Sequence, residues 1–391
     1  MIVTIIKSLH EVRGDYMPKR GRGDVGRAIL DTLDTDSGKK WTVQEVSASK
    51  KSNGTNWETT KRFLDMFSEF DMVRKIDEGG KTFYQTKRPV GKKTLYGIPV
   101  RKDHRTTLRE IYATIRNEWN MVTKKRLTKT VMHKIAVDFT EKEYPSIPHA
   151  WYLFGQVMLF PPNTHDTGSP LSDQKQIREI RARCEYYSRF DDTHEIRLDC
   201  YKRKGEKIYE CKENLYHDLV NLSVKNSSQR RRLRTLVTEF KLIMGKKELP
   251  STVATLTEDF CSCLGRIIRD MSDKRLEEAK PILIEAFDKM WSSIALYEFS
   301  RSLIEKKFFS EEFLDVILAE KKLTTEETFY EYLELLESIA PPLTLPDDEL
   351  GKRFKEVIAK SKEFSPEEKK KIEKSIDSMS TSELFRDLGI D

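Results

Sequence analysis

The chain has 391 residues, too many for one small module, and 38% of them are hydrophobic, which is enough to build buried cores. A mean hydropathy of −0.61 and the lack of an apolar run of about 18 residues predict no membrane span. The first residues lack the small-residue cleavage site of a signal peptide, so we expect a cytoplasmic protein.

The net charge of +6 is unevenly distributed. Residues 1–100 carry +6, residues 101–240 carry +8 and residues 241–391 carry −8. Because positive charge attracts polyanions, we expect any nucleic acid to bind the two front segments and the acidic rear to turn away from it.

The first hundred residues contain short elements separated by turns. Residues 1–18 have the pattern of a tail or an added strand, and residues 19–27 form a basic, glycine-rich arm suited to a phosphate backbone. Helical periodicity begins at Asp24, with apolar residues at three- and four-residue spacing. Residues 41–51 predict a second short helix, in which Thr42 is the N-cap and Glu45 completes a capping box.

A third helix and a hairpin come next. Residues 56–70 predict the helix, and residues 72–87 contain two β-rich arms on either side of Gly79 and Gly80. Two glycines between such arms are a strong short-range signal for a hairpin turn. Three helices followed by a hairpin is the element order of a winged helix-turn-helix.

This stretch, residues 24–88, resembles the winged-helix domains of prokaryotic, especially archaeal, transcription regulators. In that family a recognition helix is followed by a strand and a glycine-tipped wing. The resemblance implies a DNA-binding domain over residues 19–95, with double-stranded DNA as its partner. Asp71 stands where the family usually has glycine, and aspartate tolerates the left-handed conformation.

A winged helix would place its third helix in the major groove and its wing against the backbone or the minor groove. Asn56 can pair with adenine, Thr59 can touch a thymine methyl group, and Trp57 either reaches the DNA or closes over the core. The expected DNA-binding residues are Lys19, Arg20, Arg22, Lys50, Lys51, Asn56, Trp57, Thr59, Lys61, Arg62, Lys75, Lys81 and Arg88. The alternative is a winged helix that makes protein contacts only.

Residues 104–240 predict a basic α+β middle domain. Helices are expected over 106–122 and 127–144, and the apolar run 145–162 is interpreted as a buried core helix. Two arginine clusters in predicted helices suggest a second basic patch: Arg178, Arg181, Arg230, Arg231, Arg232 and Arg234.

The five cysteines are expected to be reduced thiols. One set of residues has zinc-ligand chemistry: His194, Cys200, Cys211 and His217. Their spacing matches no compact zinc knuckle, so we predict no metal site and keep this set as the weaker alternative. Residues 195–201 and 207–215 are instead interpreted as two strands of a hairpin with structural cysteines.

Residues 241–391 predict an acidic, all-helical C-terminal domain suited to dimerisation or to a protein partner. The chain as a whole is therefore expected to be mainly α, and α+β overall. No phosphate loop, dinucleotide fingerprint, HExxH or GxSxG motif occurs, which argues against an enzyme and predicts no cofactor. His165 and Asp166 are a weak candidate for a catalytic pair.

The favoured function is transcription regulation by a nucleoid-associated homodimer. One alternative is a replication, partition or chromatin-type factor whose basic middle segment also grips DNA. A second alternative is a nucleic-acid-processing enzyme with a site assembled from dispersed residues.

Overall fold

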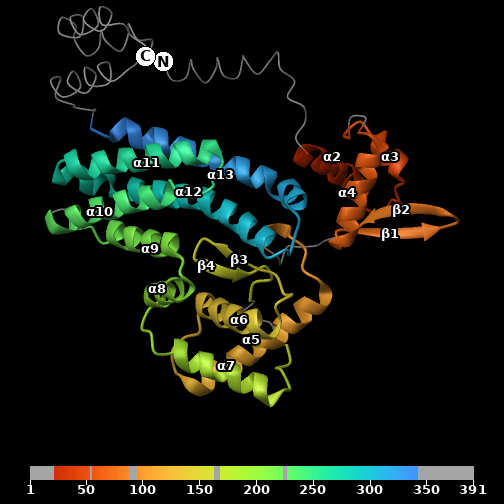
Figure 1. Cartoon of the computed structure of the whole chain (residues 1–391), viewed down its shortest axis with the longest axis horizontal. Helices are drawn as coiled ribbons and strands as arrows, with labels where there is room; N and C mark the ends of the chain where they lie inside the picture. The colour runs from red at the N-terminus through yellow and green to blue at the C-terminus, as the bar shows by residue number, and fades with distance from the viewer. Residues whose placement is uncertain (1–21, 53–54, 88–94, 163–167, 223–226, 342–391) are drawn as a thin grey trace, which may run out of the picture.

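The computed structural model describes residues 22–52, 55–87, 95–162, 168–222 and 227–341. Within these residues the chain is mainly helical, as expected, with two short antiparallel hairpins. Figure 1 shows a small front unit at one side, a stack of long helices, and a group of shorter helices below that stack. None of the described helices is both long and apolar enough to cross a membrane.

The front unit contains the three predicted helices and the predicted hairpin. Its elements are α2 (Arg22–Asp34), α3 (Val43–Ser47), α4 (Trp57–Glu69), β1 (Val73–Glu78) and β2 (Lys81–Thr86). The capping box before α3 is confirmed, because the Thr42 hydroxyl accepts from the Glu45 backbone N–H and the Glu45 carboxylate accepts from the Thr42 backbone N–H. Trp41 forms a bridge with Tyr84 of β2, which ties the segment before α3 to the hairpin.

Three residues take the left-handed backbone conformation that these turns require. Gly79 and Gly80 have φ of 58° and 75° at the tip of the hairpin, and Asp71 has a φ of 63° after α4. The hairpin pairs Glu78 with Lys81, so its register places the two glycines alone in the loop. The predicted hairpin turn and the predicted role of Asp71 are both confirmed.

The middle of the chain begins with a short 3₁₀ turn. Its elements are η1 (Leu95–Gly97), α5 (Lys102–Val122), α6 (Lys129–Glu143), β3 (His149–Tyr152), β4 (Gly155–Met158) and α7 (Gln174–Tyr187). The core helix predicted over 145–162 is wrong, because β3 and β4 form a hairpin there. Pro148 and Gly155, which has a φ of 91°, stop a helix from forming. Most of the segment is buried, as predicted, but Phe154 is 47% exposed.

The cysteine hairpin is also wrong, because two helices replace it: α8 (Thr193–Lys204) and α9 (Lys207–Val220). The Asp192 side chain caps α8 by accepting from the Glu195 backbone N–H at 2.8 Å. Gly205, with a φ of 71°, caps the other end. Residues 202–205, which lie between the two expected strands, therefore form the C-terminal end of α8, and their three cations suit the helix dipole.

The rear consists of α10 (Ser227–Met244), α11 (Ser251–Asp270), α12 (Asp273–Glu305) and α13 (Glu311–Ile339), so its described part is all-helical, as predicted. Two apolar clusters hold the fold together. One joins the front unit and α5–α7 to the adjoining ends of α12 and α13, and the other joins Trp151 and α9 to the long helices. The domain ranges remain predictions, since side chains from several of them share these clusters.

The front unit packs closely on α13. A Cβ at Gly26 of α2 would lie 2.4 Å from Val316 Cγ2, so only glycine allows this approach. The ring of Phe70, at the end of α4, lies 4.2 Å from that of Phe313. Arg62 also pairs with Glu312 at 2.7 Å. The orientation of α4 is therefore fixed partly by α13.

Candidate nucleic-acid interface

The N-terminal turn of α4 offers an exposed aromatic and an exposed cation. Half of the Trp57 surface is exposed, and Lys61 Nζ lies 5.6 Å from its ring centroid. Trp57 therefore does not close over the core. The Lys61 side chain makes no hydrogen bond or ion pair with another residue that the structure describes, although its charge helps to lower the pKa of Asp65. A flat ring beside a free ammonium can contact a nucleic-acid backbone or an unstacked base.

Asn56 is the N-cap of α4. Its side-chain oxygen accepts from the Glu58 backbone N–H at 2.8 Å, which satisfies one of the open donors at the helix start. Bidentate pairing with adenine needs both the oxygen and the amino group of asparagine. The Asn56 oxygen has a second lone pair, so pairing with adenine would share this oxygen with the cap. Thr59, which is half-buried, lies on the same turn.

Two of the expected phosphate contacts already have protein partners. Arg62 pairs with Glu312 of α13, and Lys75 donates to Asp65 at 2.9 Å. Tyr84 also donates to Asp65, at 2.8 Å. Burial raises the pKa of the Asp65 carboxyl, but these hydrogen bonds outweigh it and leave that pKa lowered. Lys75 therefore ties the hairpin to α4 before it serves any ligand.

The remaining described cations of this surface point to solvent. Lys50 follows α3 and Lys81 stands at the tip of the hairpin, and both are exposed. Lys51 is exposed as well, with a long contact of 3.4 Å to the Asp31 carbonyl. Arg74 is an exposed cation that the sequence reasoning missed. Successive side chains of β1 point to opposite faces, so a buried Val73 implies an exposed Arg74, and this alternation is the signal that could have found Arg74.

Some predicted residues lie outside the described part of the chain. They are Lys19, Arg20 and Arg88 of the interface, and His165 and Asp166 of the weak catalytic pair. Arg22 begins α2, and its side chain is not described.

The six arginines of the predicted second patch are divided between two helices. Arg178 and Arg181 belong to α7, which packs on α5 and α6, whereas the other four belong to α10, which packs on α9 and α11. Figure 1 shows these two helices at different ends of the body. Arg181 pairs with Glu118, Arg230 with Asp273 and Arg232 with Asp218, while Arg231 and Arg234 are exposed.

The four residues of the weaker zinc alternative do not converge. The rings of His194 and His217 stack with centroids 4.4 Å apart, whereas Cys200 and Cys211 are buried, the first near the charged Lys134 and the second in an apolar cluster. Burial raises the pKa of the Cys211 thiol to about 12, which opposes the thiolate that zinc needs. Across the described ranges, no group of three or more His, Cys, Asp or Glu side chains could hold a metal ion.

A buried charged cluster lies around the β3–β4 turn, and the sequence reasoning missed it. Lys134 of α6 donates to the Phe154 carbonyl at 2.9 Å. Lys212 of α9, with 1% of its side chain exposed, lies 3.7 Å from Glu213. Burial lowers the pKa of both lysines. The Glu213 carboxylate also lies within 3.4 Å of Arg197. The one available signal was that Lys212 and Glu213 fall on the apolar face of a helix.

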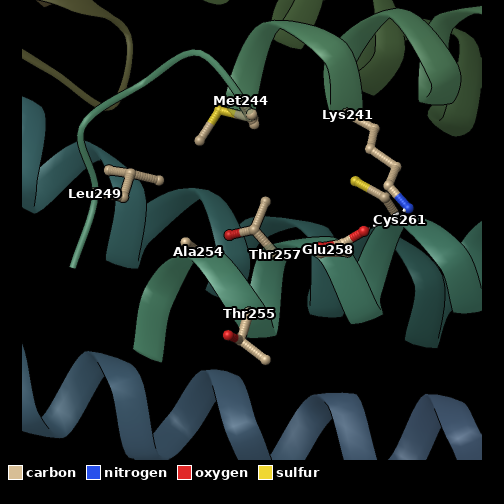
Figure 2. A pocket seen from close by; sticks show the side chains of 9 residues that line it. Lys241, Met244, Leu249, Ala254, Thr255, Thr257, Glu258 and Cys261 are labelled. Atoms are coloured by element: carbon tan, nitrogen blue, oxygen red, sulfur yellow. Dashed lines mark ion pairs between the residues drawn. The ribbon is translucent and has the colours of Figure 1, made fainter. Parts of the chain in front are cut away.

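A cavity of about 200 Å³ lies between α10 and α11. Figure 2 shows the side chains that line it. Its labelled side chains are mostly apolar or hydroxyl groups, with Lys241 and Glu258 paired at 3.0 Å on one side. Burial raises the pKa of the Cys261 thiol to about 12, so this thiol is a poor nucleophile. We assign no chemistry to this cavity.

A scan against protein-family models matches no family. Searches of curated proteins and of solved structures find no match either.

Proposed function

We propose that the chain binds double-stranded DNA through α4 and the β1–β2 hairpin, and acts as a transcription regulator. The observation that carries the proposal is the surface at the start of α4. There a half-exposed Trp57 and an unpaired Lys61 project from a helix whose opposite face is buried by Phe63 and Phe67. The element order α2, α3, α4 and hairpin, with the Trp41 bridge to the hairpin, supports the same winged-helix interpretation.

Contacts to phosphate would come from Lys50, Lys51, Lys61 and Lys81, which are exposed on the front unit. Thr59 and Trp57 would face the base edges, while Arg62 and Lys75 mainly position α4. A homodimer would present two such units to half-sites about one helical turn apart. The acidic rear would supply the dimer or partner contacts, and the protein would act in the cytoplasm, at the nucleoid.

A replication, partition or chromatin-type factor is the second candidate. Arg231 and Arg234 are exposed on α10 and make no ion pair with a residue of the described part, so the body also presents free cations. This patch is smaller than expected because Arg230 and Arg232 are paired.

Genome-wide recovery of DNA bound to the full chain separates these candidates. A small set of promoter sites, lost when Trp57 is changed to Ala, supports the regulator. One origin-like site favours a replication factor, and uniform coverage favours an architectural protein. Recovery that is unchanged by Trp57→Ala and Lys61→Ala together would contradict the proposed interface.

A further inference from the structure

A cavity of about 470 Å³ lies where the front unit meets the rest of the chain. Its walls come from the end of α4, the start of α5, the turn between α6 and β3, and the turn between α12 and α13. The volume falls within the range of roughly 300–1,000 Å³ that is typical of small-molecule sites.

The polar side of this cavity has more positive than negative groups. Arg101, Lys306 and Lys307 line it, against one acidic residue, Glu69, among the described lining residues. His104 also lines it, and burial lowers the pKa of this imidazole, which favours its neutral form. Arg101 already pairs with Asp103, which lies outside the lining. The Lys307 side chain is exposed and makes no hydrogen bond or ion pair with a residue of the described ranges.

One of these lining groups, His104, has an unsatisfied polar atom, and another, Lys306, is partly buried beside its partners. The Nδ1 atom of His104 is buried and has no hydrogen-bond partner among the described atoms. Burial lowers the pKa of Lys306, whose Nζ lies 2.6 Å from His149 Nε2 and 3.5 Å from Glu141. An anion in the cavity would favour the charged form of Lys306 and offer acceptors to the unpaired donors.

The other side of the cavity is apolar and rich in rings. Phe70, Phe308 and Phe309 line it together with prolines, and the rings of Phe70 and Phe309 lie 5.2 Å apart. Offset or edge-to-face packing on such walls favours an aromatic ligand over a purely hydrated ion.

We propose that this cavity binds a small aromatic anion, such as an aryl phosphate or an aryl carboxylate, as an effector. The ring lies against the phenylalanines and the anionic group lies between Lys307, Lys306 and His104. Because Phe70 caps α4 and packs on Phe313, occupation of the cavity shifts α4 relative to α13. The regulatory consequence rests on the proposed DNA binding, whereas the binding site itself does not.

The test measures calorimetric binding of phenyl phosphate and of benzoate to the full chain without DNA. Saturable binding of at least one probe is expected, with phenol about tenfold weaker, which is the effect of losing a charged hydrogen bond. Lys307→Glu should weaken binding by about tenfold or more, since it places like charge beside the anion. Lys246→Glu, a change at another exposed lysine, should leave it unaltered.

Ser146→Trp supplies a second variant, because Ser146 is an exposed lining residue whose enlargement fills the cavity without removing a buried contact. It should abolish probe binding while the thermal midpoint stays near that of the wild type. No saturable binding of either probe to the wild type, or binding to both Lys307→Glu and Ser146→Trp as tight as to the wild type, would overturn the site. If the probes bind but leave the affinity for duplex DNA unchanged, the effector role is wrong and the site stands. If duplex DNA does not bind at all, the proposed function fails and the effector role fails with it.

Discussion

The front unit and the region around the β3–β4 turn both contain many lysines and arginines, but they place them differently. Lys50, Lys61 and Lys81 of the front unit reach solvent, whereas Lys134 and Lys212 of the middle are buried. The described front residues 22–87 contain twelve Lys/Arg and eleven Asp/Glu, so they are almost neutral. Net charge is therefore a poor guide to where a polyanion binds, because exposure decides which cations are available.

Exposed and buried cations also differ in how much they contribute to the stability of the fold. Exposed cations contribute little to stability and are free to bind a ligand. Buried charges are costly unless each one is compensated, so removing one partner destabilises the fold strongly. The following changes test that difference, starting with the largest expected effect.

Glu213→Ala should lower the free energy of unfolding by about 3–5 kcal/mol, because it leaves Lys212 buried without its counter-charge. Chemical denaturation of the full chain measures this. Glu210→Ala on the same helix is the matched control, and its loss should stay below about 1 kcal/mol since its pair with Lys202 is long and exposed. Equal losses in the two variants would contradict the buried-cluster account.

Gly155→Ala should lower the free energy of unfolding by about 1–3 kcal/mol. Gly155 has a φ of 91°, and an added Cβ would lie 2.4 Å from Lys134 Nζ and 2.7 Å from Tyr201 Cε1. Gly265→Ala in α11 meets no atom within 4 Å, so it should instead stabilise the chain by about 0.5–1 kcal/mol. The sign difference between the two variants is the readout, and a shared sign would refute the close packing at the turn.

His133 should make stability depend on pH. Burial lowers its pKa to about 3, and its Nδ1 accepts from the Met158 backbone N–H at 3.2 Å, so the folded chain holds it neutral. The unfolded chain takes up this proton below a pH of about 6.5, so stability falls as the pH drops from there towards 3. The slope should approach about 1.4 kcal/mol per pH unit, and His133→Gln should remove it. A variant with an unchanged acid slope would show that other groups cause the dependence.

Thr42→Ala should cost about 1 kcal/mol by removing the capping box before α3. The capping box also affects the pKa of Glu45. Hydrogen bonds from the Thr42 backbone and side chain lower this pKa, although partial burial opposes them. In the variant the pKa of Glu45 should rise, as an NMR titration would record. An unchanged Glu45 titration would mean that the backbone N–H of residue 42 and Lys39, not the threonine hydroxyl, hold this pKa down.

Local signals predicted the front unit well because its elements are short and specified by nearby residues. The capping box, the Gly79–Gly80 tip and Asp71 each depend on neighbours in sequence. The middle of the chain was harder to predict, because its elements depend on contacts between residues that are far apart in sequence. The segment 145–162 is buried by contacts with α6, α8 and α12, and burial alone does not distinguish a hairpin from a helix.

The candidate interface was predictable only in part. The sequence placed exposed residues at the start of α4, but not the partners of Arg62 and Lys75, which come from α13 and from α4. The buried cluster of Lys134, Lys212 and Glu213 could not be inferred either, because its members meet only through the tertiary fold.

We propose that the front unit, not the rest of the chain, binds DNA. The most direct measurement is the affinity of the full chain for a labelled DNA duplex over a series of salt concentrations. Lys61→Ala and Lys81→Ala should each reduce the log–log salt slope by about 0.9, the value for one lost phosphate contact, whereas Arg231→Ala and Arg234→Ala should leave it unchanged. A slope that falls with the two arginines and ignores the two lysines would contradict the account.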